Sequence, residues 1–356
     1  MKRYQYLDVA RGFGLLLVII SHSCGLSRFL INYYIPLFFV VSGYIYKEGR
    51  SYKENISHKA KRLLIPYFGY SAVLLAIYAL MGRTFAETKE SVFGILYSRY
   101  CLYDTTVVTD NVYLFTVANG AMWYLTAFFA ASLVYHLVID RCLADKKFLI
   151  GTLIVLTAIT MALADIPVLL PWSIDLACVG TIFMIAGTLL GRTQFFEKKW
   201  NIPLIVAVLA IYILTSCLDP GINMSIREYG IYGALSVPFF IIVGLTGSLL
   251  CIWFGKLIEN TAPGRFIAYV GKNTIFLLAF HIFALEVVER IASKFITIPA
   301  PGGTAVPFVL YHALRITVAV LGCLAASELL NRIKKSLQQK NVYSLFALNR
   351  LQQKNV

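Results

Sequence analysis

Long apolar runs of 17 to 25 residues alternate along this chain with short polar segments. Runs of this length match the roughly 20 residues that an α-helix needs to cross a bilayer. The pattern therefore predicts an all-α integral membrane protein with about ten transmembrane helices. The predicted spans are 12–31, 33–47, 63–82, 121–139, 148–165, 172–191, 202–219, 231–254, 266–288 and 306–330.

The composition agrees with this pattern and the charge distribution adds an orientation. Hydrophobic residues make up 59% of the chain and charged residues 14%, against roughly 45–50% and 25% in soluble domains. The net charge of +14 would suit a nucleic acid, but 23 of the 32 Lys and Arg residues fall in the two terminal segments and alternate loops, and seven in the other loops. By the positive-inside rule both termini are cytoplasmic, and no nucleic-acid partner is expected.

The same pattern divides the chain into two parts. Residues 1–335 are expected to form a single ten-span domain, and 336–356 a polar cytoplasmic tail that repeats one hexapeptide at 337–342 and 351–356. The longest loop on the non-cytoplasmic side is 83–120, and loops of that length are usually functional or partly structured.

Three ionisable residues in or beside the first span, Asp8, Arg11 and His22, are candidates for function, because burying such groups in a bilayer is costly. Arg11 and His22 are 11 residues apart, which places them on one helix face about 16 Å apart along the axis. Asp8 precedes Arg11 by three residues and can pair with it. This spacing suits a ligand with an anionic head and a thin reactive arm, as coenzyme A has. The alternative is an interfacial ion pair and a polar contact between helices.

Other polar residues lie within the last two predicted spans. His281 and Glu286 are either polar core contacts or part of an acceptor site. His312 and Arg315 are three residues apart, so they share a helix face. Arg315 needs a partner, for which Asp175 or Glu286 is available, and the alternative is a role in acceptor binding.

Two aromatic residues, Trp123 and Tyr124, begin the fourth predicted span. Such residues are typical of the aromatic belt at a membrane surface, and a platform for a sugar ring is the alternative. The sequence has no zinc-ligand spacing, phosphate-binding loop or dinucleotide fingerprint. Neither a metal nor a tightly bound cofactor is expected.

Several segments resemble the membrane acyltransferase-3 family. Residues 6–22 are similar to its N-terminal signature, which has an Asp, an Arg-Gly pair and an Arg-x10-His spacing. Residues 36–44, which end in Ser-Gly-Tyr, resemble its second-span motif, and 58–66 its Arg-x-x-Arg motif followed by Pro. Residues 123–125 and 273–281 are similar as well. The resemblance extends over nearly the whole plan of spans.

The resemblance implies an acyltransferase that uses cytosolic acyl-CoA, acetyl-CoA in particular, as co-substrate. His22 would act as general base on the acceptor hydroxyl or would briefly carry the acyl group. The first basic position of the Arg-x-x-Arg motif is Lys59, which keeps the charge but loses bidentate phosphate recognition. The implied catalytic residues are Asp8, Arg11 and His22. The implied residues for CoA binding are Arg11, Lys59, Arg62, Ser42 and Tyr44.

The compact chain resembles the fucose-4-O-acetylase-like branch and polysaccharide O-acetyltransferases. This implies a bacterial inner (cytoplasmic) membrane location and a glycan acceptor. Membrane lipid and glycan-assembly proteins or a second copy of the chain are the expected partners. One rival hypothesis is a transporter or flippase, although no inverted repeat is visible. A purely structural subunit is the other, and it would not explain Arg11 and His22 on one face.

Overall fold

The structure is a computed structural model that describes residues 4–25, 28–103, 119–219, 223–299 and 305–353. Within these ranges the secondary structure is helical, apart from two isolated β-bridges. The predicted all-α class is confirmed. Lys2 and Arg3, which contribute to the charge count, lie outside the described residues, as do 104–118 of the long loop and the last three residues of the tail.

Seven helical segments in the described part of the chain are long and apolar enough to cross a membrane. They contain α1 (Gln5–Cys24), α3 (Tyr52–Leu80), α5 (Trp123–Ala144), α6 (Lys146–Ala164), α7 (Ala177–Arg192), α9 (Val237–Ile258) and the first part of α12 (Ala305–Gln353). Two shorter apolar helices are α2 (Arg28–Tyr44) and α8 (Ile202–Leu218). Together they indicate a protein that crosses the membrane several times.

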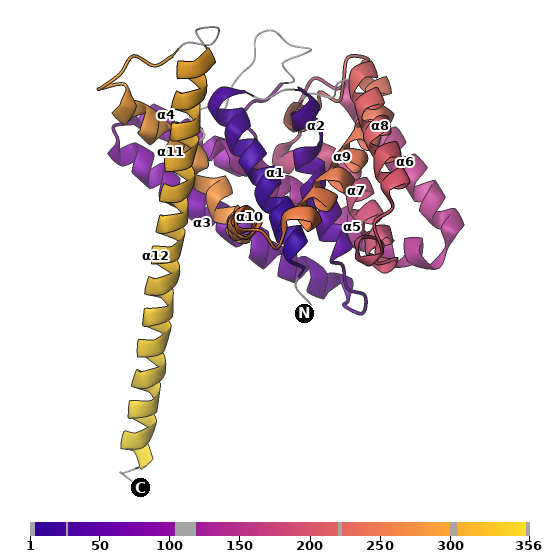
Figure 1. Ribbon diagram of the computed structural model, residues 1–356. Helices are drawn as coiled ribbons and strands as arrows, with labels where there is room; N and C mark the ends of the chain where they lie inside the picture. Colours follow the sequence, from indigo (N-terminus) through magenta and orange to yellow (C-terminus); the bar gives the residue numbers. More distant parts are fainter. Residues whose placement is uncertain (1–3, 26–27, 104–118, 220–222, 300–304, 354–356) are drawn as a thin grey trace. The chain divides into compact units, whose positions relative to one another are not determined.

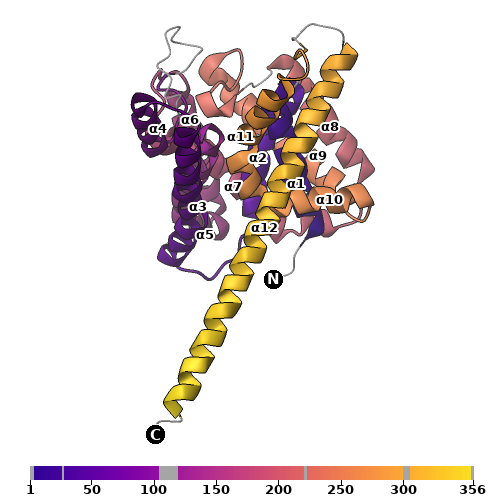
Figure 2. The same cartoon turned by 90° about the vertical axis from the view of Figure 1, so that its left-hand side faces the viewer.

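The chain forms two compact units, Met1–Ala279 and Phe280–Val356. In the first unit α2 is central and packs on α7, α9 and α1, while α5 joins α7 to α3 (Figure 1, Figure 2). The short helix α10 (Ala262–Lys272) lies against α1. The second unit contains most of α11 (Thr274–Ala292) and all of α12.

Glycines allow the backbones of the central helices to touch. A Cβ atom on Gly43 of α2 would lie 1.9 Å from the carbonyl oxygen of Met184, and one on Gly187 of α7 would lie 2.0 Å from that of Val40. Small residues at such crossings are typical of membrane helices, where close packing rather than exclusion of water drives association.

Helices α6 and α8 expose large apolar side chains, which include Ile150, Ile154 and Val155 on α6 and Val206 and Leu214 on α8. A surface of this kind would be unfavourable in water. It is the surface expected of helices that face lipid.

The boundaries of several predicted spans are wrong: the span 33–47 corresponds to Arg28–Tyr44, and the helix of the span 63–82 begins at Tyr52. The first helix runs over Gln5–Cys24 rather than 12–31, because the paired charges at its start are compatible with helix and do not mark its end. The predicted span 266–288 is broken at Asn273, which leaves the helical conformation (φ −104°, ψ 19°) between α10 and α11. This break lies next to the glycine contact that holds α10 on α1.

Two expectations about the polar segments can be compared with the structure. The loop 83–120 contains helix α4 (Phe85–Tyr97), so it is partly structured as predicted. The tail is helical as far as Gln353 and forms the last part of α12.

Candidate active site

Helix α1 carries all three ionisable residues found in the N-terminal signature. The Arg11 guanidinium lies 3.1 Å from the Asp8 carboxylate, and the Asp8 side chain is buried. The predicted pair is therefore present. Since α1 is continuous from Gln5 to Cys24, Arg11 and His22 lie on one rigid helix, about 16 Å apart along its axis. His22 lies in the last turn of α1 and is exposed, closer to the helix end than the span 12–31 implied.

The backbone around Arg11 is clamped by α10. A Cβ on Gly12 would lie 2.0 Å from the carbonyl oxygen of Ile267, and a Cβ on Gly271 would lie 1.9 Å from that of Asp8. Neither helix can shift toward the other, and a larger residue at either glycine would force them apart. Arg11 thus projects from a backbone of fixed position.

Lys59 on α3 contacts residues of both α2 and α5. Its ammonium group donates a hydrogen bond to Ser42 Oγ (3.1 Å) and lies over the ring of Phe128, 4.7 Å from the ring centre. The charges of Arg11 and Arg62 are close enough to act on this ammonium group. We call Arg11, Lys59 and Arg62 the basic cluster. The structure therefore brings together the three cationic residues that the sequence analysis assigned to phosphate binding.

The basic cluster has an excess of positive charge. Asp8 supplies one carboxylate, to Arg11, and Lys59 has no carboxylate partner among the described residues. Like charges held close together destabilise one another unless an anion joins them. The arrangement is therefore suited to an anionic ligand.

Tyr44 lies apart from this cluster. It is buried against Tyr6, whose hydroxyl donates to Glu197 (2.8 Å) and contacts the Tyr44 hydroxyl (3.3 Å). Ser42 and Tyr44 are two residues apart, so they point to different sides of α2. Ser42 faces Lys59, whereas Tyr44 belongs to a tyrosine cluster that packs on Phe196.

The two aromatic residues at the start of α5 differ in position. Trp123 is half-buried, whereas Tyr124 is buried among Phe38, Phe39 and Phe128, with ring centres 5.5–5.6 Å away. The charge of Arg11 acts on Tyr124. Tyr124 is thus a wall residue beside the basic cluster, and of the two Trp123 is the more accessible for a sugar.

The second unit holds the remaining candidates. His281 is buried on α11, Glu286 is half-buried one turn or more further along, and His312 packs against the tilted ring of Phe308 on α12. Arg315 forms an ion pair with Glu289 and donates from Nε to the carbonyl oxygen of Leu285 (3.2 Å). Arg315 thereby joins α12 to α11 within the unit.

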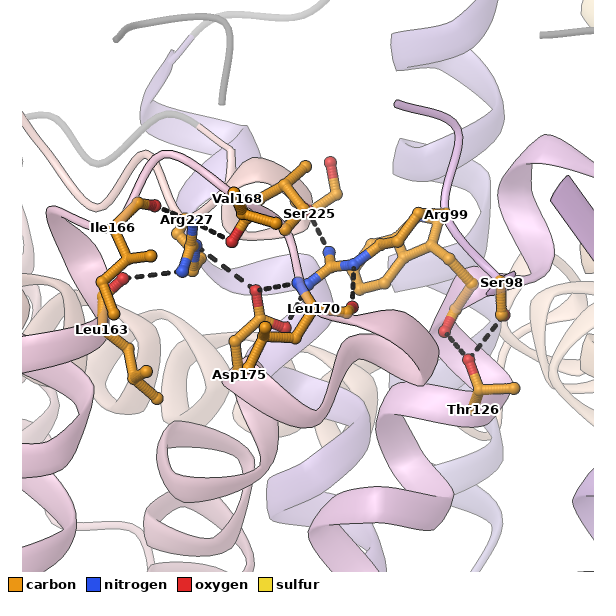
Figure 3. A network of polar contacts seen from close by, with 12 residues as sticks. Ser98, Arg99, Thr126, Leu163, Ile166, Val168, Leu170, Asp175, Ser225 and Arg227 are labelled. Atoms are coloured by element: carbon orange, nitrogen blue, oxygen red, sulfur yellow. Dashed lines mark hydrogen bonds and ion pairs between the residues drawn. The ribbon is translucent and has the colours of Figure 1, made fainter. Parts of the chain in front are cut away.

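The expectation that Asp175 is available to pair with Arg315 is wrong. Asp175 accepts from the Arg99 guanidinium and lies 3.3 Å from Nε of Arg227, with all three side chains buried (Figure 3). We call these three residues the arginine clasp. Arg99 and Arg227 were counted as loop charges, and their burial depends on contacts between segments far apart in the sequence.

Backbone carbonyls complete the arginine clasp (Figure 3). Arg99 donates to Leu170 and Ser225, and Arg227 donates to Leu163, Ile166 and Val168. The clasp thereby ties the segment after α4 to the ends of α6 and η2 (Pro171–Leu176) and to the segment before α9.

Comparison with protein families matches residues 4–328 to a family described as an acyltransferase domain. Searches of curated proteins and of solved structures found no match. The family match covers nearly all of the first unit and residues 280–328 of the second, and it includes every candidate residue named above.

Proposed function

The chain belongs to the membrane acyltransferase-3 family, and we propose that it moves an acyl group, acetyl in particular, from cytosolic acyl-CoA to a hydroxyl group of a cell-surface or lipid-linked glycan. The observation that carries the donor assignment is the basic cluster beside Asp8, with His22 further along the same continuous helix. The family membership does not favour a transporter.

The proposed donor fits the chemistry of the basic cluster. Coenzyme A carries its phosphates at one end and the thioester at the end of an extended pantetheine arm. Arg11, Lys59 and Arg62 bind the phosphates, and the arm extends along α1 over the ~16 Å that separate Arg11 from His22. The thioester is then delivered near the far end of the helix.

His22 acts on the acceptor in this proposal. Its imidazole accepts the proton of the acceptor hydroxyl as the oxygen attacks the thioester carbonyl. A carbon–oxygen bond forms, the carbon–sulfur bond breaks, and the departing thiolate takes the proton from the imidazolium. An unperturbed imidazole titrates near pH 6.5, which suits both proton transfers.

The acceptor assignment extends the family resemblance to polysaccharide O-acetyltransferases. The proposed acceptor-binding residues are Trp123, Tyr124, His281, Glu286, His312 and Arg315. Trp123 supports this assignment, because it is half-buried at the start of α5 and has a ring face suited to a sugar.

We also propose ten spans, with both termini in the cytoplasm of a bacterial cell and the protein in its inner membrane. Helices α1, α2, α3, α5, α6, α7, α8, α9, α11 and α12 supply the spans in chain order. A cysteine placed at Lys53 should react with an impermeant maleimide only after the cells are permeabilised. Labelling in intact cells would reverse the orientation.

The experiment that tests the function compares wild type and His22→Ala in detergent, with acetyl-CoA binding and thioester hydrolysis as readouts. We expect saturable binding by both proteins, with affinities within about twofold, and loss of hydrolysis in His22→Ala, because His22 lies far from the phosphates. Failure of the folded wild-type protein to bind any acyl-CoA would overturn the proposal.

A further inference from the structure

His136 on α5 is a buried histidine with no hydrogen bond in the described part of the structure. Its side chain is 8% exposed, and neither ring nitrogen has a partner there. The ring packs against Tyr135 and Tyr46, with ring centres 4.9 and 5.8 Å away. No sequence motif marks this residue, which comes after the TrpTyrLeu segment on the same helix.

A buried imidazole without partners is costly. It carries at least one N–H donor in either charge state, and a buried donor left unsatisfied costs about 1–3 kcal/mol. Native proteins therefore supply a protein group, a water molecule or a ligand to such atoms. The nearby carboxylate of Asp140 accepts a hydrogen bond from the Tyr46 hydroxyl (2.8 Å) and forms none with His136 in the described part of the structure.

The electrostatic surroundings indicate which ligand His136 would bind. Lys59 is close enough for its charge to act on the imidazole, and the charges of Arg11 and Arg62 act on Lys59 in turn. Asp140 supplies a negative charge near the imidazole. The three cations of the basic cluster outnumber the two carboxylates, Asp8 and Asp140, so an anion that accepts hydrogen bonds is the favoured occupant.

The position of His136 along α5 sets its distance from the basic cluster. It follows Phe128, the ring beneath the Lys59 ammonium group, by eight residues, or about 12 Å along the helix. Tyr46, just past the end of α2, and Asp140 lie at the same end of the first unit. His136 therefore lies far enough from Phe128 to contact a different group of an extended ligand than Lys59 does.

We propose that His136 donates a hydrogen bond to a phosphate group at the nucleotide end of the bound acyl-CoA. This inference rests on the proposed function, because it assigns a further binding residue to the same donor. His136 and the basic cluster then hold different phosphates of one ligand, since CoA carries both a diphosphate and a ribose 3′-phosphate.

The test measures binding of two probes, CoA and acetyl-pantetheine, to the full-length protein in detergent. His136→Phe keeps the ring shape and removes both nitrogens. It should weaken CoA binding about 10- to 100-fold, the loss expected for a hydrogen bond to a charged group, and leave acetyl-pantetheine binding unchanged, because that probe lacks phosphate. His136→Gln keeps an N–H donor and should retain most of the CoA affinity.

Tyr135→Phe is the matched control, because it removes a buried hydroxyl, bonded to Thr188 (2.6 Å), from the ring beside His136. It should bind CoA as wild type does.

CoA binding by His136→Phe within twofold of wild type, or an equal loss for both probes, would overturn the inference. If His136→Phe does not fold, weak CoA binding by a folded His136→Gln overturns it, and wild-type-like binding supports it. If wild type itself does not bind CoA, the proposed function falls as well.

Discussion

The arginine clasp and the basic cluster are both positively charged sites within the first unit, but they differ in how their charges are satisfied. In the clasp, two buried arginines share Asp175 and donate to five backbone carbonyls. In the basic cluster, Asp8 pairs with Arg11, and Lys59 has one hydroxyl and one aromatic ring as its neighbours. The charges of the clasp are satisfied by groups of the protein itself, whereas the basic cluster carries more positive charge than Asp8 offsets.

The clasp also borders unusual backbone. Trp172 and Ser173 in η2 both have φ values of 56°, a left-handed conformation that costs about 1–3 kcal/mol for such residues. They lie between Leu170 and Asp175, whose carbonyl and carboxylate bind Arg99. The clasp holds this turn in place, and its charges are therefore used within the protein rather than on a ligand.

Asp175→Asn should have the largest effect on stability. It leaves Arg99 and Arg227 buried without a carboxylate, and breaking a buried ion pair from one side costs about 3–5 kcal/mol. We expect a clear fall in the midpoint of thermal unfolding of the purified protein. Glu48→Gln is the control, because its ion pair with Arg192 (3.4 Å) is exposed and worth at most about 1 kcal/mol. Equal midpoints for the two variants would contradict a structural role for the clasp.

Lys59→Met should weaken CoA binding without lowering the stability of the protein. Since Lys59 has no carboxylate partner among the described residues, its removal strands no buried anion and should not lower the unfolding midpoint. CoA affinity should fall about 10- to 100-fold, because a charged hydrogen bond to phosphate is lost. Lys61→Met, on the exposed face of α3, should bind CoA normally. A loss of stability without a loss of binding would make the cluster structural.

The smallest effect on stability is expected from changes at the N-terminus of α4, the helix that ends two residues before Arg99. Glu87 accepts hydrogen bonds from the Thr84 N–H (2.7 Å) and hydroxyl (2.8 Å), and these bonds lower the pKa of Glu87. A lowered pKa in the folded state means that the stabilisation is present above the unfolded pKa of about 4.3 and is lost as pH falls through the folded value.

Hydrogen exchange of the α4 amides, measured from about pH 5 to pH 3 and corrected for intrinsic rates, would detect this loss. Thr84→Val removes the hydroxyl and should make protection less dependent on pH than in wild type. An unchanged pH dependence would show that the cap does not stabilise α4. The exposed carboxylate of Glu87 is thus expected to stabilise the fold less than the buried carboxylate of Asp175.

The fold was largely predictable, because bilayer thickness requires long apolar runs and these are visible in the sequence. The predicted spans 172–191 and 202–219 lie within two residues of the observed α7 segment and α8. The misplaced first span and the undetected break at Asn273 have a common cause. In both places a polar or charged residue is accommodated by a contact within its own segment, Arg11 by Asp8 and Asn273 by the carbonyl oxygen of Tyr269, which hydrophobicity alone does not reveal.

The candidate site was predictable only in part. The Asp8–Arg11 pair follows from helical spacing, and its presence confirms that inference. The sequence could not show that Ser42 contacts Lys59 whereas Tyr44 packs elsewhere, because this depends on which face of α2 meets α3. His136 gave no signal in the sequence, because a histidine acquires a role only from the groups that lie around it in the folded protein.

The sequence by itself determined the helical class, the α1 charge pattern and the membership of the acyltransferase family. These depend on local periodicity and short motifs, which a linear chain displays directly. Only the tertiary structure decided that Arg99 and Arg227 converge on Asp175, that Lys59 meets Ser42, and that Glu289 pairs with Arg315. Each of these contacts depends on the register between helices, and that register is set by packing around residues such as Gly43 and Gly187.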